Sequence, residues 1–335
     1  MIPKIVRRGL PLLPLAALAG CNTVVMNPTG DIAKQQADLI TVSVVLMLII
    51  IIPVMLLTVW FAWRYRKNAN AKYEPDWDHS TKLELIIWGA PLLIIIVLGL
   101  ITWVSTHKLD PYRPLDRLDA NRPIPASTKP LEVQVVSLDW KWLFIYPEQG
   151  IATVNQLVTP IDTTIRFKMT SSTVMNTFYI PTLAGMIYTM PGMQTELNAV
   201  LNKTGDYHGL SANFSGDGFS HMKFAYKGVT MDEFNAWVQE TKANTTVLDR
   251  ADYMVLEKPT AKEAVRLYGQ VEPALFNRIL NRCVAEGTMC MNQQMHEDMK
   301  RNEMAASIRQ LPKDGKSQLA EALEMCVAPI NTLMK

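Results

Sequence analysis

Residues 207–222 have the spacing of a copper-binding loop but not its ligands. A loop with cysteines at positions 211 and 215 and a histidine at 219 would hold two copper ions between bridging thiolates and an imidazole. This chain has Ser211, Ser215 and Phe219 there. Because hydroxyls and a phenyl ring cannot hold a soft metal as thiolate and imidazole do, the segment predicts a protein that binds no metal here.

Glu84 is a second candidate for chemistry, because it lies at the edge of a long apolar stretch. The protonation and the partners of an ionisable group at such a place are constrained by the low dielectric of the membrane. A structural role is the alternative, since Thr81 and Glu84 have the spacing of a capping box and an acid in a first helical turn complements the helix dipole. The two roles are compatible.

Two apolar stretches, at about 39–63 and 83–106, are predicted to place Glu84 at a membrane surface. Each is long enough to cross a hydrocarbon core that needs ~20 helical residues. A buried hairpin of a soluble protein is the alternative, but the unbroken apolar run 42–57 disfavours it. The loop between the stretches is rich in Lys and Arg, so it is predicted to face the cytoplasm with both chain ends outside.

Residues 1–21 have the pattern of a bacterial lipoprotein signal peptide, in which basic residues precede an apolar run. The run ends Leu18-Ala19-Gly20-Cys21, which resembles a lipobox. We expect cleavage before Cys21 and its lipidation outside the cell membrane, in agreement with the loop charges. An ordinary signal sequence with a chance cysteine is the alternative.

The rest of the chain predicts an exported domain with an appendage. A net charge of +2 over 335 residues implies no polyanionic partner, and no nucleic-acid module is recognisable. Residues 108–130, rich in Pro and Asp, are predicted to be a linker, and 131–228 a β-sandwich or Greek-key barrel with period-two alternation. The expected strands are 131–138, 140–146, 163–169, 194–201 and 222–226.

After Gly228 the pattern becomes helical, so residues 229–335 are predicted to form a helical arm and tail. Capping-box spacing at Thr230–Glu233 and again at Thr260–Glu263 predicts the starts of two helices. Pro273 and Pro312 are expected to separate further helices.

The C-terminal part of the chain also contains several cysteine and methionine residues. Three exported cysteines, Cys283, Cys290 and Cys326, allow one disulfide and one leftover thiol, and the sequence does not choose the pair. A copper-binding tail is conceivable, but methionines at helical spacing more often fill gaps between packed elements, so we expect packing. The residues concerned are Met289, Met291, Met295, Met299, Met304 and His296.

The order of these features resembles subunit II of the heme–copper terminal oxidases, in the cytochrome o-type ubiquinol oxidase branch that lacks the dinuclear copper site. Besides the lipobox and the copper-like loop, residues 83–91 (LELIIWGAP) and 139–147 (DWKWLFIYP) carry the resemblance, which runs from Cys21 to about Cys283. It implies a membrane-anchored α+β fold: a two-helix transmembrane hairpin, a periplasmic cupredoxin-like β-sandwich and a C-terminal helical arm.

The resemblance also implies which residues occupy the degenerate copper site. Cytochrome c oxidases of the family hold two coppers with one His on an earlier strand and a loop supplying Cys, Glu, Cys, His and Met. Only the methionine is kept here, and a thioether alone is a weak ligand, so we expect neither bound copper nor cytochrome c as a partner. The aligned residues are Asn176, Ser211, Asn213, Ser215, Phe219 and Met222.

Four nearby residues receive structural roles. His208 and His221 are out of register with the copper pattern, and we expect them to be surface or strand histidines without a metal role. Trp140 stands where electrons from cytochrome c enter in the relatives. Without an acceptor behind it, Trp140 is expected to pack, as is Trp142.

The implied complex is a proton-pumping ubiquinol:oxygen oxidoreductase of the bacterial inner membrane, in which this chain is not itself catalytic. Hemes, copper and ubiquinol are expected in subunit I, with subunits I, III and IV and membrane lipid as partners. A glutamate in the setting Glu-x-x-x-Trp-x-x-Pro lies at the entrance of a proton pathway in this family, and Glu84 matches it. The alternatives are a menaquinol oxidase subunit, a copper-containing cytochrome c oxidase subunit and a free-standing lipoprotein with a cupredoxin-like binding domain.

Overall fold

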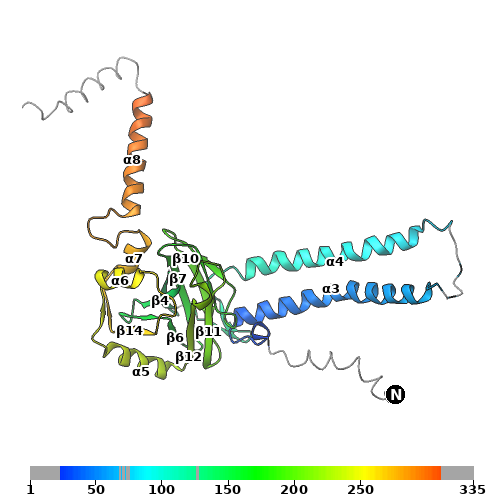
Figure 1. Ribbon diagram of the computed structural model, residues 1–335, viewed down its shortest axis with the longest axis horizontal. Helices are drawn as coiled ribbons and strands as arrows, with labels where there is room; N and C mark the ends of the chain where they lie inside the picture. The colour runs from blue at the N-terminus through cyan, green and yellow to red at the C-terminus, as the bar shows by residue number, and fades with distance from the viewer. Residues whose placement is uncertain (1–22, 68, 70–71, 73–75, 126–127, 311–335) are drawn as a thin grey trace, which may run out of the picture.

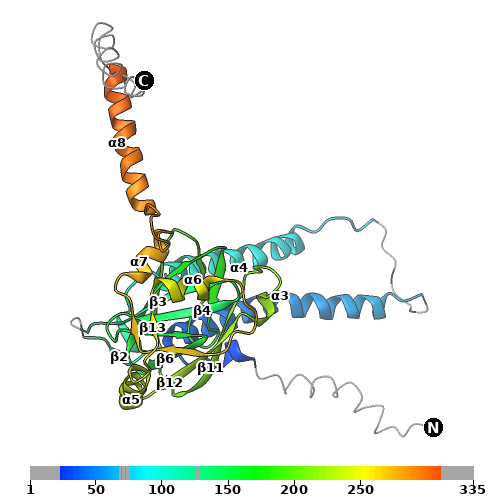
Figure 2. The same ribbon diagram turned by 60° about the vertical axis from the view of Figure 1, so that its left-hand side comes forward.

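The structure is a computed structural model, and it describes residues 23–310 except 68, 70–71, 73–75 and 126–127. A long helical hairpin, a two-sheet sandwich and a projecting C-terminal helix follow one another along the chain (Figure 1, Figure 2). This arrangement confirms the predicted membrane-anchored α+β class. Cys21, Pro312 and Cys326 lie outside the described residues.

The hairpin consists of α3 (Asp31–Arg64) and α4 (Thr81–Lys108), preceded by the 3-10 turn η2 (Val24–Met26). At 1.5 Å per residue the two helices are about 51 and 42 Å long, which exceeds the ~30 Å of a hydrocarbon core. Their most apolar windows are only 0% and 6% buried in this chain. That exposure disagrees with the alternative of a buried soluble hairpin and agrees with two membrane spans.

The first turns of α3 are built into the sandwich. Ile32, Ala33 and Ala37 are buried, and Asp31, 4% exposed, pairs with Arg117 at 3.0 Å. Just before the helix, the backbone N–H of Thr29 donates to the carbonyl of Thr182 at 2.9 Å. The hairpin is therefore attached to the sandwich through packing and hydrogen bonds as well as through the chain itself.

Five predicted strands are present, with small shifts at their ends. They are β3 (Leu131–Leu138), β4 (Lys141–Tyr146), β7 (Thr164–Ser171), β10 (Thr195–Val200) and β12 (Lys223–Val229). Buried side chains alternate with more exposed ones along parts of β3, β7 and β12, whereas every residue of β4 is buried.

Five further strands of the sandwich were not predicted, and four of them are only three to five residues long. They are β5 (Ile151–Val154), β6 (Gln156–Pro160), β8 (Asn176–Tyr179), β9 (Ile187–Thr189) and β11 (Gly205–Ser211). With β14 (Arg266–Tyr268) from the following part of the chain, the two sheets have the orders β10-β7-β3-β4-β5-β14 and β6-β12-β11-β8-β9.

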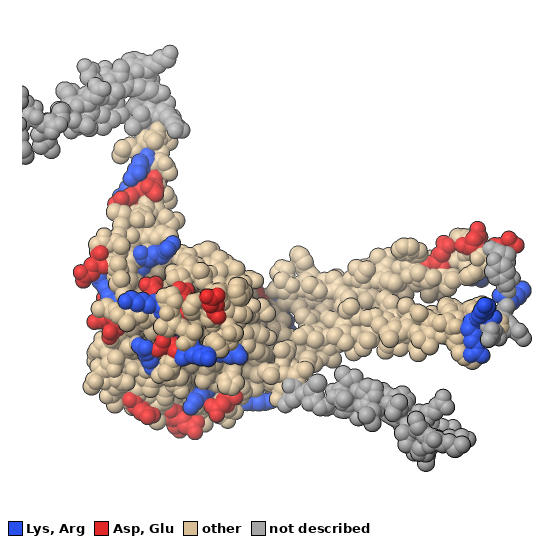
Figure 3. Space-filling view, in the orientation of Figure 1, with Lys and Arg blue, Asp and Glu red and all other residues tan. Residues whose placement is uncertain are grey.

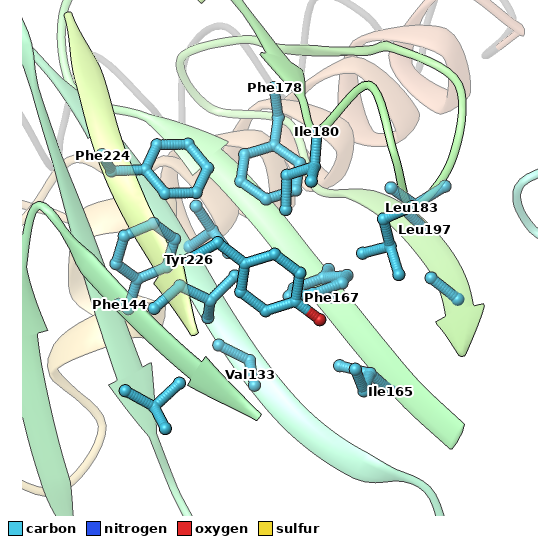
Figure 4. Close-up of a cluster of buried hydrophobic side chains, with 14 of the residues drawn as sticks. Val133, Phe144, Ile165, Phe167, Phe178, Ile180, Leu183, Leu197, Phe224 and Tyr226 are labelled. Carbon is cyan, nitrogen blue, oxygen red and sulfur yellow. The ribbon is translucent and has the colours of Figure 1, made fainter. Parts of the chain in front are cut away.

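The core lies between these sheets and is rich in aromatic rings (Figure 4). Phe178 and Phe224 stack with ring centroids 5.5 Å apart and an interplanar angle of 7°. Phe144 meets Phe224 edge-on at 5.0 Å. Tyr146 is fully buried, and its hydroxyl donates to the carbonyl of Val158 at 2.9 Å. Large apolar rings hold the two sheets together.

The predicted linker contains a small hairpin of β1 (Arg117–Asp119) and β2 (Arg122–Pro123). Its Arg122 pairs with Asp119 at 2.6 Å and with Asp162 of the sandwich at 2.7 Å. These ion pairs fasten this part of the chain to the domain.

The arm begins as predicted with α5 (Met231–Lys242), capped by a complete capping box of Thr230 and Glu233. The second predicted helix start was wrong. Thr260 does donate to Glu263 at 2.7 Å, but the chain continues as strand β14 (Arg266–Tyr268), which pairs with β5 at the sheet edge. A free sheet edge supplies the backbone hydrogen bonds that a helix would otherwise provide, and the sequence does not reveal it.

The remaining arm covers the outer face of the six-stranded sheet. Tyr253, Tyr268 and Phe276 join a second buried cluster there with residues of β3, β4 and β5. The elements are β13 (Val247–Leu248), α6 (Arg250–Glu257), β15 (Gln270–Val271) and α7 (Leu275–Leu280).

A disulfide joins Cys283 to Cys290, with 4.8 Å between their Cα atoms, and this decides the pairing that the sequence left open. Directly after it begins α8 (Met291–Gln310). The expectation that the tail methionines pack was wrong for most of them. Met291 is half-buried, whereas Met289, Met295, Met299 and Met304 are exposed, because α8 leaves the sandwich after its first residue.

Candidate functional sites

The residues predicted at the degenerate copper positions converge at one end of the sandwich. Asn176 begins β8 and Ser211 ends β11, and the Ser211 hydroxyl donates to Asn176 Oδ1 at 3.2 Å. Asn213 and Ser215 follow in the next loop, Phe219 starts the 3-10 turn η3 (Phe219–His221), and Met222 directly precedes β12.

A chain of neutral hydrogen bonds fills this end of the sandwich. Asn176 Nδ2 donates to Ser137 Oγ at 3.4 Å and to the carbonyl of Val174 at 3.3 Å. Ser137 in turn shares a hydrogen bond of 3.0 Å with Thr189. Asn176, Ser137, Thr189 and Ser211 are each at most 3% exposed. We call these four residues the buried polar network.

Ser137 and Thr189 were missed by the sequence analysis. Ser137 lies on the predicted strand β3, and Thr189 lies on the unpredicted strand β9. Nothing in their sequence context distinguishes them from other strand residues, and their role follows only from the way the two sheets bring β3, β8, β9 and β11 together.

Trp140 lies over the loop that follows Ser211. Its backbone has a φ of 65°, and its Nε1 donates to the carbonyl of Ser215 at 3.0 Å. Gly218 lies directly against the indole, because a Cβ there would be 2.3 Å from Trp140 Cδ2. Trp142 is fully buried with its ring centroid 5.4 Å from that of Phe178. The packing roles predicted for both tryptophans are confirmed.

Lys141, next to Trp140, attaches the arm to this region. Its side chain is 1% exposed, and Nζ donates to the carbonyl of Lys258 at 2.7 Å and to the hydroxyl of Thr260 at 2.6 Å. Burial lowers the pKa of this amine below its ordinary value. His208 and His221 are exposed, as predicted.

Glu84 lies at the other end of the hairpin, in the first turn of α4. Its Oε1 is 2.7 Å from Nδ1 of His79, whose Nε2 is 3.2 Å from the hydroxyl of Thr81. The predicted capping box was wrong: Ser80 is the N-cap residue, and no side chain caps the helix. Thr81 already belongs to the helix, and the Glu84 carboxylate binds the imidazole instead. The sequence analysis missed His79.

Charges at this end of the hairpin are partly separated, with Lys82 in the first turn of α4 as an exception. Figure 3 shows acidic side chains at the start of α4 and basic side chains at the end of α3. This distribution complements the dipoles of both helices, since a helix N-terminus favours anions and a C-terminus cations. Glu84 remains half exposed, with 49% of its side chain accessible to solvent.

The sandwich and the arm both match known families. The profile of "Cytochrome C oxidase subunit II, periplasmic domain" matches residues 132–229, and that of "COX Aromatic Rich Motif" matches residues 242–287. The chain is 48% identical over 274 residues to the cytochrome bo(3) ubiquinol oxidase subunit 2 of Pseudomonas putida. The aligned residues make up 82% of this chain and 84% of that protein.

The ubiquinol oxidase subunit 2 of Acetobacter aceti is 49% identical over 281 residues, or 84% of this chain and 89% of that protein. The chain belongs to the ubiquinol oxidase subunit II family. Among solved structures, the periplasmic domain of subunit II of cytochrome oxidase from Bradyrhizobium japonicum is similar to 34% of this chain and 94% of that one, with 25% identity and a TM-score of 0.33.

Within this subunit II the ligand chemistry does not fit a dinuclear copper centre. The residues at the expected positions offer hydroxyls, amides and a phenyl ring, whereas copper in such a centre needs thiolate and imidazole. Met222 supplies the remaining soft atom, but it is fully buried, and its Sδ lies 4.0 Å from the Ser215 hydroxyl. Phe219 packs edge-on against Phe214 at 5.6 Å.

Proposed function

We propose that this chain is the non-redox subunit II of a proton-pumping ubiquinol oxidase, in which it serves as a scaffold and contributes to proton uptake. The complex oxidises ubiquinol and reduces oxygen to water. The observation that carries the proposal is the buried polar network. At Asn176 and Ser211, where copper ligands are expected in a copper-binding subunit II, the side chains form hydrogen bonds with each other and with Ser137.

The chemistry of the electron donor supports a scaffold without a metal. A water-soluble donor needs a relay in the exported domain, whereas quinol is soluble in lipid and can deliver electrons inside the membrane. Hemes, copper and the quinol site then belong to subunit I. A sandwich held by its own hydrogen bonds is sufficient as an exported cap.

Glu84 is proposed to collect protons at the cytoplasmic entrance of a pathway into subunit I. Three features support this role: its place in the first turn of a membrane helix, its half-exposed carboxylate and the imidazole of His79 at 2.7 Å.

The proposed setting is the bacterial inner membrane, with both chain ends on the periplasmic side and a lipid on Cys21. Subunits I, III and IV are the proposed partners, and the long apolar surfaces of α3 and α4 are available to subunit I and to lipid. A menaquinol-oxidising complex is the second candidate, because the quinone is recognised in subunit I.

Gentle detergent purification of the tagged chain tests the proposal. We expect a haem spectrum, co-purifying membrane subunits and oxidation of a ubiquinol analogue faster than of a menaquinol analogue. After the subunits are separated, copper should accompany another subunit. Copper on this chain together with cytochrome c oxidation would support a copper-containing subunit, and purification without haem would support a free-standing lipoprotein.

A further inference from the structure

A cleft of about 430 Å³ lies between the linker and the outer face of the six-stranded sheet. Thr164 and Arg166 of β7 line it on the sheet side, together with Asn198 of β10, which is the register partner of Arg166. The linker contributes mainly apolar walls: Pro114, Leu115, Ile124, Pro125 and Pro130. The cleft shares no residue with the buried polar network.

Arg166 has no counter-ion among the described residues. No hydrogen bond or ion pair joins its guanidinium to them, and its Nε is shielded from solvent. Glu132, its register partner on β3, pairs instead with Lys168 at 2.8 Å. Asp116, which also lines the cleft, pairs with Arg113 at 3.1 Å. Because a half-buried charge without a partner is unfavourable, Arg166 indicates that the cleft receives an anion.

Two hydroxyls add neutral donors to the same cleft. Thr164 is buried on β7, and Thr128 stands opposite on the linker. Neither hydroxyl makes a hydrogen bond to the described part of the chain. A guanidinium and two hydroxyls therefore line one cleft with their hydrogen-bonding capacity unused, which suits a ligand with several acceptor oxygens.

The cleft lies close to the base of the hairpin. Asn198 donates to the carbonyl of Pro111 twice, from its backbone N–H at 3.0 Å and from Nδ2 at 3.1 Å. Pro111 is three residues after the end of α4, which is about 10 Å of extended chain. Pro114 and Asp116 also line a smaller hollow with Asp31, the first residue of α3. If the hairpin crosses the membrane, the cleft is therefore on the membrane side of the exported domain.

We propose that this cleft binds a phosphoryl oxyanion, carried by the phosphodiester of a lipid headgroup, with Arg166 as its charged contact. The planar fork of a guanidinium matches two phosphate oxygens, and one unpaired positive charge complements the single negative charge of a phosphodiester. Inorganic phosphate offers the same oxyanion. It would fill only a small part of the cleft, since a water molecule takes ~30 Å³. The apolar walls suit the carbon atoms on either side of a phosphodiester.

Hydrogen exchange on the purified protein, with the subunits that accompany it, tests this site. Three probes are added separately: dihexanoyl phosphatidylglycerol, inorganic phosphate, and dihexanoylglycerol, which has the same acyl chains without a phosphoryl group. Phosphatidylglycerol should slow exchange severalfold in residues 112–125 and in β7, and dihexanoylglycerol should not. Protection by the lipid alone identifies a headgroup as the source of the oxyanion, and equal protection by inorganic phosphate identifies free phosphate.

Charge variants show whether Arg166 makes the contact. Arg166→Gln should raise the half-saturating concentration of the probe roughly tenfold or more, because a hydrogen bond to a charged group is lost. Arg166→Lys keeps the charge but not the fork, so its effect should be smaller. Lys227→Gln removes the same charge from an exposed position on β12 and should have no effect.

Three results would overturn the site. They are no protection by either phosphoryl probe, equal protection by dihexanoylglycerol, and the same half-saturation in Arg166→Gln as in the unsubstituted protein. The melting temperature of Arg166→Gln should not fall, since the change removes an unpaired charge, and this measurement separates lost binding from misfolding. Because the site lies within this chain, the outcome does not depend on the proposed oxidase function.

Discussion

Replacing Asn176 by alanine tests whether the buried polar network stabilises this end of the sandwich. Asn176 makes three side-chain hydrogen bonds, to Ser137, Val174 and Ser211, at 3.2 to 3.4 Å. A net contribution near the low end of the 0.5–1.5 kcal/mol range for each bond gives about 2 kcal/mol. The hydroxyls left behind are buried, which adds to the cost.

The network also predicts coupling between its members. Ser211→Ala alone should cost about 1 kcal/mol, because it leaves Asn176 Oδ1 without its donor. The double variant should cost less than the sum by about 0.5 kcal/mol or more, since their shared bond is lost only once. Ser220→Ala, at an exposed serine of the same region, serves as the control and should change nothing.

Hydrogen exchange followed by mass spectrometry on the intact complex measures these local free energies. A loss of about 2 kcal/mol corresponds to roughly 30-fold faster exchange in β8 and β11, at 1.4 kcal/mol per tenfold. Quinol oxidation should be unchanged, because the proposed function routes no electron through this site. Strictly additive effects, unchanged exchange or a fall in turnover of the assembled complex would refute the reasoning.

Three further predictions concern the ends of the hairpin and the arm. Glu84→Gln should lower turnover severalfold while the complex still assembles. The loss should be smaller than the roughly 100-fold expected for a group that transfers a proton in a transition state, because nearby surface acids still supply protons. Unchanged turnover would count against the proton role. Gly30→Ala should destabilise the fold by about 3 kcal/mol through overpacking and so lower its melting temperature, because the new Cβ would lie 2.4 Å from the carbonyl oxygen of Val200. Gly89→Ala is the control: its Cβ would have nothing within 4 Å, so no overpacking cost is expected. Burial raises the pKa of the Glu257 carboxyl, so its ionisation destabilises the fold as pH rises above the ordinary value of 4.5. Glu257→Gln should therefore raise the melting temperature at about pH 8 and less so at about pH 5, and a pH-independent difference would contradict the assignment.

The elements predicted correctly are those whose pattern is strong within one segment. The two spans and strand β3 carry long apolar or alternating runs, and Thr230 with Glu233 forms its capping box from neighbours only three residues apart. Such local signals depend little on the rest of the chain.

The predictions that were wrong depend on contacts that the local sequence pattern does not contain. The Thr260–Glu263 pair makes its hydrogen bond, but the following residues complete a sheet edge far away in the sequence, so tertiary pairing prevails over the local helix signal. Glu84 likewise loses its predicted cap because His79, five residues earlier, binds the carboxylate. The positions of the degenerate copper site could be predicted from a spacing pattern, whereas Ser137 and Thr189 could not, because only strand pairing brings them there.

These residues explain how the sandwich keeps its shape without a metal. In a copper-binding relative, bonds to the metal would join the strand at Asn176 to the loop after Ser211. Here Ser211 bonds to Asn176, Asn213 Nδ2 donates to the carbonyl of Met175 at 3.1 Å, and the indole of Trp140 binds the carbonyl of Ser215. The first two contacts join the same two segments that a metal would join, and the third joins the loop to the turn between β3 and β4. We therefore predict that the stability of this end of the sandwich does not depend on copper, in agreement with the proposed non-redox role.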